Sequence, residues 1–532
     1  MVSAPSLRER IRSVSLIFAC GTALFSDGYA NTVIGSVNTL LTRIYGQQAL
    51  ADHNYSTIVN STGFAGTVVG MLLFGLLSDK IGRKFGMMSA ATIVILFSGL
   101  SAASSGANGS VGGLLSMLSA MRFFLGIGVG AEYPCGSVAA SEQSEEPVIS
   151  HHARHRWLGL ATVSTLVFGF AIASFVPWVL YLIFGLNHLR AVWRLSLGLG
   201  VVPALAVLLW RLNMDEPMRY KSDSMKNTRI PYKLVFKRYW RSLMAISVVW
   251  FVLDIIVYRY PVRCARYVAD SIFLILSQFS IYSSTILNNI TGGSQDLKII
   301  FGWNTVINLF YFPGQYQYNI ARYDSAWSLI LSSVFIGAVT GSLVVDYLGP
   351  KYTLTIGFLL QALIGFIISG LYVPLTHHIA AFSTLYGLFD SFSQFGAGLC
   401  TFILASKACP TAVRGQYFGV AAASGKLGAF IGIWIFPPIV KAFGGSETVK
   451  GNTGPFWIAS GLCVFGALVS ILFVHPLTPE GIAREDCEFR KYLEAHGYDT
   501  SRMGFIRSLP EETSSEDKKR DSDVDRKVVE KV

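Results

Sequence analysis

Charged residues are scarce in this chain of 532 residues, since Asp, Glu, Lys and Arg make up 14% of it and hydrophobic residues 52%. A soluble globular protein usually carries about 25% charged residues. A chain with so little charge lacks the polar surface that keeps a folded protein in water. Most of its helices must therefore face lipid or one another, which excludes an ordinary soluble protein and indicates an integral membrane protein.

Cysteine is also sparse, and the seven cysteines show no spacing typical of a metal or redox site. Several stand in apolar runs, where a cysteine usually serves as a small buried hydrophobic residue. The sequence also shows no nucleophile–base set, metal cluster or phosphate-cradling loop. We therefore predict a protein that is not an enzyme and that has neither a metal site nor an organic cofactor.

Long apolar stretches are abundant, and a membrane span needs roughly 20 such residues. They lie at about 14–34, 59–78, 85–104, 112–134, 158–184, 191–211, 242–258, 296–313, 354–372, 378–404, 415–437 and 455–475. This pattern predicts an all-α membrane protein of about twelve transmembrane helices in two six-helix halves, without a cleaved signal peptide. The predicted parts are an N-terminus (1–13), a first half (14–211), a central loop (212–241), a second half (242–475) and a tail (476–532).

Basic residues gather on one predicted side of the membrane, chiefly at the N-terminus and in the central loop at 212–241. Loops rich in Lys and Arg face the cytoplasm, so both termini are predicted to be cytoplasmic. The net charge of +11 is then explained by topology and not by binding to nucleic acid. Glycosylation sequons at Asn54 and Asn60 fall on the predicted outer side.

A short charged loop occurs twice, once after the second span and once after the eighth. The copies share an aspartate, a glycine and a lysine at equal offsets, namely Asp79, Gly82 and Lys84 in the first and Asp346, Gly349 and Lys351 in the second. Two copies in two halves indicate internal duplication, which is a common way to build transporters. The loop resembles the loop signature of the major facilitator superfamily. The chain resembles that superfamily over nearly its whole length. We predict gating roles for Asp79, Gly82, Arg83 and Asp346, because such a turn can tie helix ends in one state.

Polar residues inside the spans are energetically costly and are therefore functional candidates. They include Asp27, Arg122, Glu132, Tyr133, Trp250, Asp254, Tyr258, Asp390, Gln394 and Lys426. Lysine and tyrosine donors suit a phosphate oxygen, and a carboxylate in a low dielectric can carry a coupling proton. Two alternatives stay open: Lys426 could only neutralise Asp27 or Asp254, and for Arg122 a gating or packing role is favoured over substrate contact.

Several of these motifs resemble the phosphate:proton symporter branch of the superfamily. They are Gly-Ala-Glu-Tyr-Pro at 130–134, the face formed by Trp250, Asp254 and Tyr258, Ser-Gly-Lys at 424–426, and Pro-Thr-Ala-Val-Arg-Gly at 410–415. Within this branch, Ser-Asp-Gly-Tyr at 26–29 and the tail after Asp486 are similar to fungal glycerophosphodiester permeases. The resemblance implies that Tyr133, Trp250, Tyr258 and Lys426 surround a phosphoryl group. It also implies that Asp27, Glu132 and Asp254 handle protons.

The predicted function is proton-coupled import of glycerophosphoinositol or glycerophosphocholine across the plasma membrane by alternating access. Its partners are a small phosphate-containing solute, protons and the lipid bilayer. The alternatives are an inorganic phosphate transporter and a non-transporting nutrient sensor. Glu132 stands where phosphate carriers of the branch usually have aspartate, and no glutamine lies between Val163 and Ser174. Both departures favour a phosphodiester over inorganic phosphate.

Two segments depart from the family pattern. Residues 262–278 follow the seventh span directly, and residues 315–337 interrupt the eighth. We predict that both are insertions, either retained in-frame introns or genuine elaborations of the chain. Sequencing the transcript separates these two hypotheses.

Overall fold

The computed structural model describes residues 6–51, 55–257, 334–377, 385, 388–445, 448–477 and 481–504. All regular secondary structure in these ranges is helical. The predicted span at 296–313, Tyr258 and nearly all of the two proposed insertions lie outside them. Only residues 334–337 of the second insertion are described, and they form the first turn of a continuous helix.

The described residues of the first half form eleven α-helices and two π-helical turns. The helices are α1 (Leu7–Gly21), α2 (Leu24–Tyr45), α3 (Gln47–Ala51), α4 (Tyr55–Lys80), α5 (Arg83–Ala102), α6 (Val111–Glu132), α7 (Val138–Gln143), α8 (Arg154–Gly159), α9 (Thr165–Phe184), α10 (Leu189–Gly198) and α11 (Val201–Leu212). The π turns, Tyr133–Ser137 and Leu160–Ser164, join α6 to α7 and α8 to α9. The fourth and fifth predicted spans are therefore each one long helix with an internal π turn.

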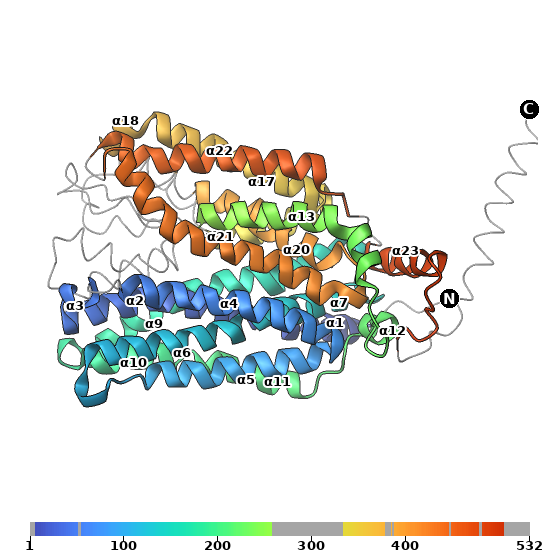
Figure 1. Cartoon of the computed structure of the whole chain (residues 1–532), viewed down its shortest axis with the longest axis horizontal. Helices are drawn as coiled ribbons and strands as arrows, with labels where there is room; N and C mark the ends of the chain where they lie inside the picture. Colours follow the sequence, from blue (N-terminus) through green and yellow to red (C-terminus); the bar gives the residue numbers. More distant parts are fainter. Residues whose placement is uncertain are drawn as a thin grey trace, which may run out of the picture.

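The second half begins after α12 (Met218–Asp223) in the central loop. Its helices are α13 (Tyr232–Val257), α16 (Val334–Leu348), α17 (Pro350–Gly370), α18 (Tyr372–His377), α20 (Leu399–Lys407), α21 (Arg414–Ala442), α22 (Val449–Phe473) and the tail helix α23 (Gly481–Ala495). A π turn, Ser393–Gly398, precedes α20. In Figure 1 the two halves lie along each other, with α12 and α23 at the same end of the bundle.

Ten helical stretches of the described residues are long and apolar enough to cross a membrane. They coincide with the second to seventh and the ninth to twelfth predicted spans. The first predicted span, 14–34, differs because the helix breaks after Gly21 and resumes at Leu24. Its second part, α2, buries many polar side chains, among them Asp27, Asn31 and Asn38. These polar residues lower the mean hydropathy of α2. The helix tolerates them because it faces the protein interior instead of lipid.

The two halves meet mainly through two helix pairs, α4 with α21 and α8 with α16. The first pair packs so closely that a Cβ on Gly75 would lie 2.7 Å from the carbonyl oxygen of Gly415. In the second pair, a Cβ on Gly159 would lie 2.6 Å from the Ser342 hydroxyl. Each repeated loop thus follows a helix, α4 or α16, that packs against the opposite half.

Candidate functional site

Asp27 anchors a polar cluster on the first half of the molecule. It lies in the first turn of α2, just beyond the helix break, and is 2% exposed. The Tyr133 hydroxyl and the Asn31 amide both donate hydrogen bonds to its carboxylate. Tyr133 reaches Asp27 from the π turn that follows α6. The broken helix and the π turn therefore bring together two side chains that the sequence predicted to act jointly.

The second half contributes Lys426 and Asp254, from α21 and α13. The Lys426 amine lies 3.5 Å from Asp254 Oδ2, and both side chains are almost fully buried. The same amine lies 5.5 Å from the centre of the Tyr133 ring, within range of a cation–π contact. Tyr133 thus touches Asp27 of one half and faces Lys426 of the other. The ion pair of Lys426 with Asp254 is one of the two pairings that the sequence left open as an alternative for this lysine.

Aromatic rings form one wall of this cluster. Trp250 packs at 5.0 Å from Phe402 and at 5.6 Å from Phe418, measured between ring centroids. Phe402 also lies 5.4 Å from the Tyr133 ring and so links the two halves. The sequence prediction missed Phe402, because a phenylalanine in an apolar span carries no signal that separates a site residue from core.

Arg122 belongs to the same region of the first half but binds backbone. Its Nη1 donates to the carbonyl oxygen of Ala30 at 2.7 Å, and the residue is 2% exposed. A Cβ added at Gly63 of α4 would lie 3.1 Å from Arg122 Nη2. The guanidinium therefore packs between α2 and α4.

Glu132 points into the first half. Its Oε1 accepts a hydrogen bond from Nη1 of Arg211 in α11 at 2.8 Å. Arg211 was not identified from the sequence. It stands at the end of a span, where an arginine is expected from topology alone.

Asp79, of the first repeated loop, lies at the end of the bundle that carries α12 and α23, which we call the closed end. Its carboxylate accepts hydrogen bonds from the backbone N–H groups of Gly415 and Gln416, each at 2.9 Å. These groups open α21, and a helix start favours a negative charge. Gly82 has a φ of +148°, which suits glycine, and a Cβ there would lie 2.4 Å from the Glu216 carboxylate. The first loop is therefore bound directly to the second half.

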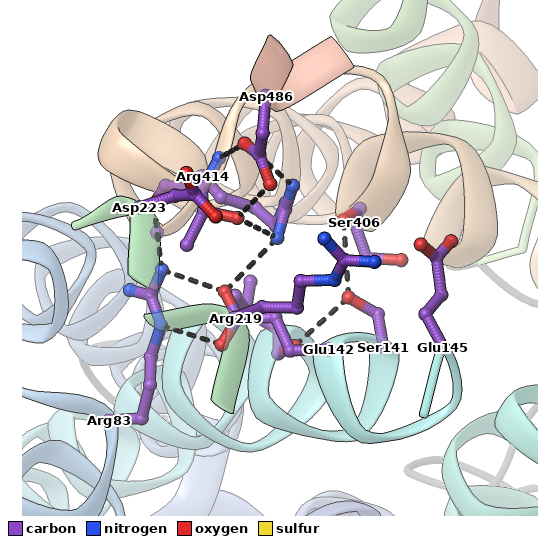
Figure 2. Close-up of polar contacts among 12 residues, drawn as sticks. Arg83, Ser141, Glu142, Glu145, Arg219, Asp223, Ser406, Arg414 and Asp486 are labelled. Carbon is purple, nitrogen blue, oxygen red and sulfur yellow. Dashed lines mark hydrogen bonds and ion pairs between the residues drawn. The ribbon is translucent and has the colours of Figure 1, made fainter. Parts of the chain in front are cut away.

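Arg83 extends this contact into a buried charge network that crosses both halves (Figure 2). It pairs with Asp79 at 2.5 Å and with Glu142 of α7 at 3.0 Å. Glu142 also pairs with Arg414 of the second half at 3.1 Å. Nη2 of Arg83 further donates to the carbonyl oxygen of Thr411 at 3.1 Å. Glu142 was missed from the sequence, because it reads there as an ordinary charge beyond the end of a span.

Asp346, of the second loop copy, makes the reciprocal contact. Its two oxygens accept hydrogen bonds from the backbone N–H groups of His155 and Arg156 at 3.0 and 3.1 Å. These groups lie in the first turn of α8 in the first half. Gly349 has a φ of +80°, so both copies use a glycine in the left-handed region. The duplication seen in the sequence is therefore also a duplication of contacts.

The tail helix α23 covers the closed end. Asp486 accepts hydrogen bonds from the backbone N–H and the hydroxyl of Thr411 at 2.6 and 2.7 Å. Its carboxylate lies 3.8 Å from Arg414. Burial raises the pKa of Asp486 to about 7. On the outer side of α23, Glu485 and Glu488 pair with Arg238, each at 3.2 Å.

The two predicted glycosylation sites stand differently. Asn60 lies in α4, is 1% exposed, and accepts a hydrogen bond from Asn38 at 3.0 Å. Its burial argues against a glycan there. Asn54 lies outside the described residues.

Two helical halves, bound together at one end and sharing a buried polar cluster, define a membrane transporter with the major facilitator fold. The chain belongs to the sugar (and other) transporter family, which residues 14–230 and 296–480 match. A solved proton:xylose symporter of the same superfamily covers 91% of this chain and is itself covered completely, with a TM-score of 0.66 at 19% identity. The predicted fold class is thereby confirmed, and the chain is a multi-pass membrane protein.

The chain also resembles curated relatives over nearly its whole length. A glycerophosphocholine permease of Candida albicans is 39% identical, with 93% of this chain and 85% of the relative covered. A major glycerophosphoinositol permease of the same organism is 36% identical, with 92% and 83% covered. A probable inorganic phosphate transporter of Arabidopsis thaliana is 28% identical, with 86% and 90% covered. The resemblance to glycerophosphodiester permeases inferred from the sequence motifs is therefore confirmed.

Proposed function

We propose that this protein imports a glycerophosphodiester, glycerophosphocholine or glycerophosphoinositol, together with protons across the plasma membrane. The relatives named for these solutes support the substrate class. The closed end is then cytoplasmic, in agreement with the basic residues at the N-terminus and in the central loop.

The observation that carries this proposal is the position of Lys426 between Asp254 and Tyr133. A phosphodiester carries one negative charge and two free oxygens, which suit one ammonium group and a few hydroxyl donors. Lys426 supplies the positive charge, and Tyr133 supplies a hydroxyl within the same cluster. The Trp250 and Phe402 rings provide an apolar wall beside them. Because the donors come from both halves, a bound solute touches both, as alternating access requires.

Proton coupling follows from competition for Lys426. In the structure, Asp254 is an anion that faces this lysine at 3.5 Å. A phosphodiester that binds Lys426 takes the place of Asp254, and an unpaired buried carboxylate is costly unless it binds a proton. Asp27 shares the cluster through Tyr133 and is the second proton-binding group of the proposal. Transport of the anion and uptake of the proton are thereby linked.

Alternating access requires the closed end to open. Asp79 and Asp346 accept hydrogen bonds from the first turns of helices in the opposite half. These bonds stabilise the state in which this end is closed and must break in the state in which it is open. The Arg83–Glu142–Arg414 network must separate at the same time. The predicted gating residues Asp79, Gly82, Arg83 and Asp346 therefore keep that role in the proposal.

Inorganic phosphate is the second candidate solute. The chain is 28% identical to a probable inorganic phosphate transporter, and Lys426 would serve either anion. The higher identity to the glycerophosphodiester permeases favours the larger solute.

Uptake by cells that lack their own carriers tests the proposal. We expect saturable uptake of labelled glycerophosphocholine or glycerophosphoinositol that rises at acidic external pH and is competed by the other solute. Excess inorganic phosphate should compete weakly. Uptake of labelled phosphate without uptake of either diester would reject the proposed substrate class.

A further inference from the structure

The ion pair between Arg211 and Glu132 is built from the first half alone. Arg211, next to last in α11, is completely buried, and Glu132 at the end of α6 is 2% exposed. Within the described part of the chain, the Arg211 guanidinium donates hydrogen bonds to residues of α1, α5 and α6. Lys426 and Asp254, by contrast, reach the central cluster from the second half. The Arg211–Glu132 pair is therefore a buried ion pair separate from the central cluster. The two are neighbours in sequence, since Glu132 directly precedes Tyr133.

Arg211 binds the end of α1 directly. Its Nε donates to the carbonyl oxygen of Ala19 at 3.0 Å, and its Nη2 donates to that of Cys20 at 2.6 Å. The last carbonyl groups of a helix have no N–H group four residues later to accept from, and a cation is favourable there. α1 ends at Gly21, so the arginine stabilises the side of the helix break that α1 contributes. A further bond to the carbonyl oxygen of Met87 at 3.2 Å adds α5 to the same contact.

Glu132 joins this helix break to the π turn. It directly precedes Tyr133, the first residue of the π turn, whose hydroxyl donates to Asp27. A Cβ at Gly136 would lie 2.7 Å from the Cys20 carbonyl oxygen and 3.1 Å from Glu132 Oε2. The turn therefore packs tightly on the ion pair and on the end of α1. The helix break and the π turn both position residues of the central cluster. The Arg211–Glu132 ion pair contacts both of these elements.

We infer that Glu132 is a positioning residue, which acts through Arg211 to align Asp27 and Tyr133, and that it does not carry the coupling proton. The sequence resemblance implied proton handling for Glu132, but its Oε1 accepts a hydrogen bond from the Arg211 guanidinium in a buried ion pair. Asp27 is held instead by the hydroxyl of Tyr133 and the amide of Asn31. This inference rests on the proposed function, since it assigns roles within proton-coupled uptake.

Uptake kinetics of Glu132→Gln test the positioning role. We expect the KM for glycerophosphocholine to rise by about tenfold, because the Gln amide oxygen can still accept a hydrogen bond from Arg211 but the charge of the ion pair is lost. The acid stimulation of uptake should keep the wild-type profile, and Glu132→Asp should restore much of the KM. Glu488→Gln, which also removes a carboxylate from ion pairs but lies in α23, is the matched control with an unchanged KM. An unchanged KM in Glu132→Gln, or loss of its pH dependence, would overturn the inference.

A second measurement needs no substrate and separates this inference from the proposed function. Melting temperatures of the purified wild type, Glu132→Gln, Arg211→Gln and the double variant form a double-mutant cycle. Each single change leaves a buried charge unpaired, so we expect both to lower the melting temperature and the double variant to recover part of it. The difference in melting temperature between the wild type and the double variant should stay constant from pH 5 to 8. Additive losses, or a gap that closes at acidic pH, would overturn the inference, whereas a wild type that takes up no diester would reject only the proposed function.

Discussion

The two copies of the repeated loop make the same backbone contact but differ in everything around it. Asp79 and Asp346 each accept two N–H groups from the first turn of a helix in the opposite half. Asp79 is 1% exposed and is also paired with Arg83, whereas Asp346 is only partly buried. At the position equivalent to Arg83, the second copy has Pro350, which opens α17.

This difference indicates where closure is concentrated. Among the described residues, ion pairs connect the first copy, and not the second, to the Glu142–Arg414 network and, through Arg414, to Asp486 of the tail helix. A buried charge with several partners is costly to leave unpaired, while a partly exposed one is screened by water. Duplication thus supplied two matching backbone contacts, and we expect the first copy to contribute more to the closed state than the second.

Asp79→Asn should have the largest effect on closure. It removes the charge from hydrogen bonds to Gly415 and Gln416, which is worth about 2 kcal/mol or roughly 30-fold in population. Alkylation of the buried Cys409 by a maleimide, relative to the exposed Cys487, reports opening of this end. We expect the Cys409 rate to rise by about that factor, and Asp499→Asn, an exposed carboxylate of the tail, to leave it unchanged. No increase would mean that Asp79 does not hold the closed state.

Asp346→Asn should have a smaller effect in the same direction. The side chain accepts comparable hydrogen bonds from His155 and Arg156 but is partly exposed. We therefore expect the closed state to lose about 1 kcal/mol, which raises the alkylation rate of Cys409 roughly fivefold. The same cysteine labelling measures it. An increase equal to that of Asp79→Asn would break the comparison between the two loop copies.

Docking of α23 should depend on pH. Burial raises the pKa of Asp486 to about 7 in the docked helix, above the ordinary value of roughly 3.9 of a released carboxyl. The docked state therefore binds the proton more tightly, and docking strengthens as the pH falls from 8 to 5. Protease cleavage of α23 should be slower at pH 5.5 than at pH 8, and Asp486→Asn should remove the difference. Faster cleavage at acidic pH would contradict this assignment.

The sequence predicted the ten apolar spans of the described residues, and it singled out several residues that lie in the central cluster, for a physical reason. A charged residue in an apolar span is conspicuous, so Asp27, Asp254 and Lys426 could be grouped before their distances were known. Partners at the ends of spans could not be found in this way, since Arg211 and Glu142 resemble ordinary loop charges. The partners of Asp79 and Asp346 are backbone N–H groups, which carry no residue signature. The helix break after Gly21 was also not predicted. The polar residues of α2 were assigned to one continuous span, and only their burial shows that α2 faces the protein interior.

The proposed transport depends most on Lys426 as the phosphodiester ligand, and equilibrium binding of labelled glycerophosphocholine to the purified protein tests this role directly. Lys426→Ala removes a charge-assisted hydrogen bond of about 2–3 kcal/mol, so the Kd should rise roughly 30- to 150-fold. Lys426→Arg, which keeps the charge, should lose less. Binding by Lys426→Ala with the wild-type Kd would contradict the account, because the anion would then be bound elsewhere.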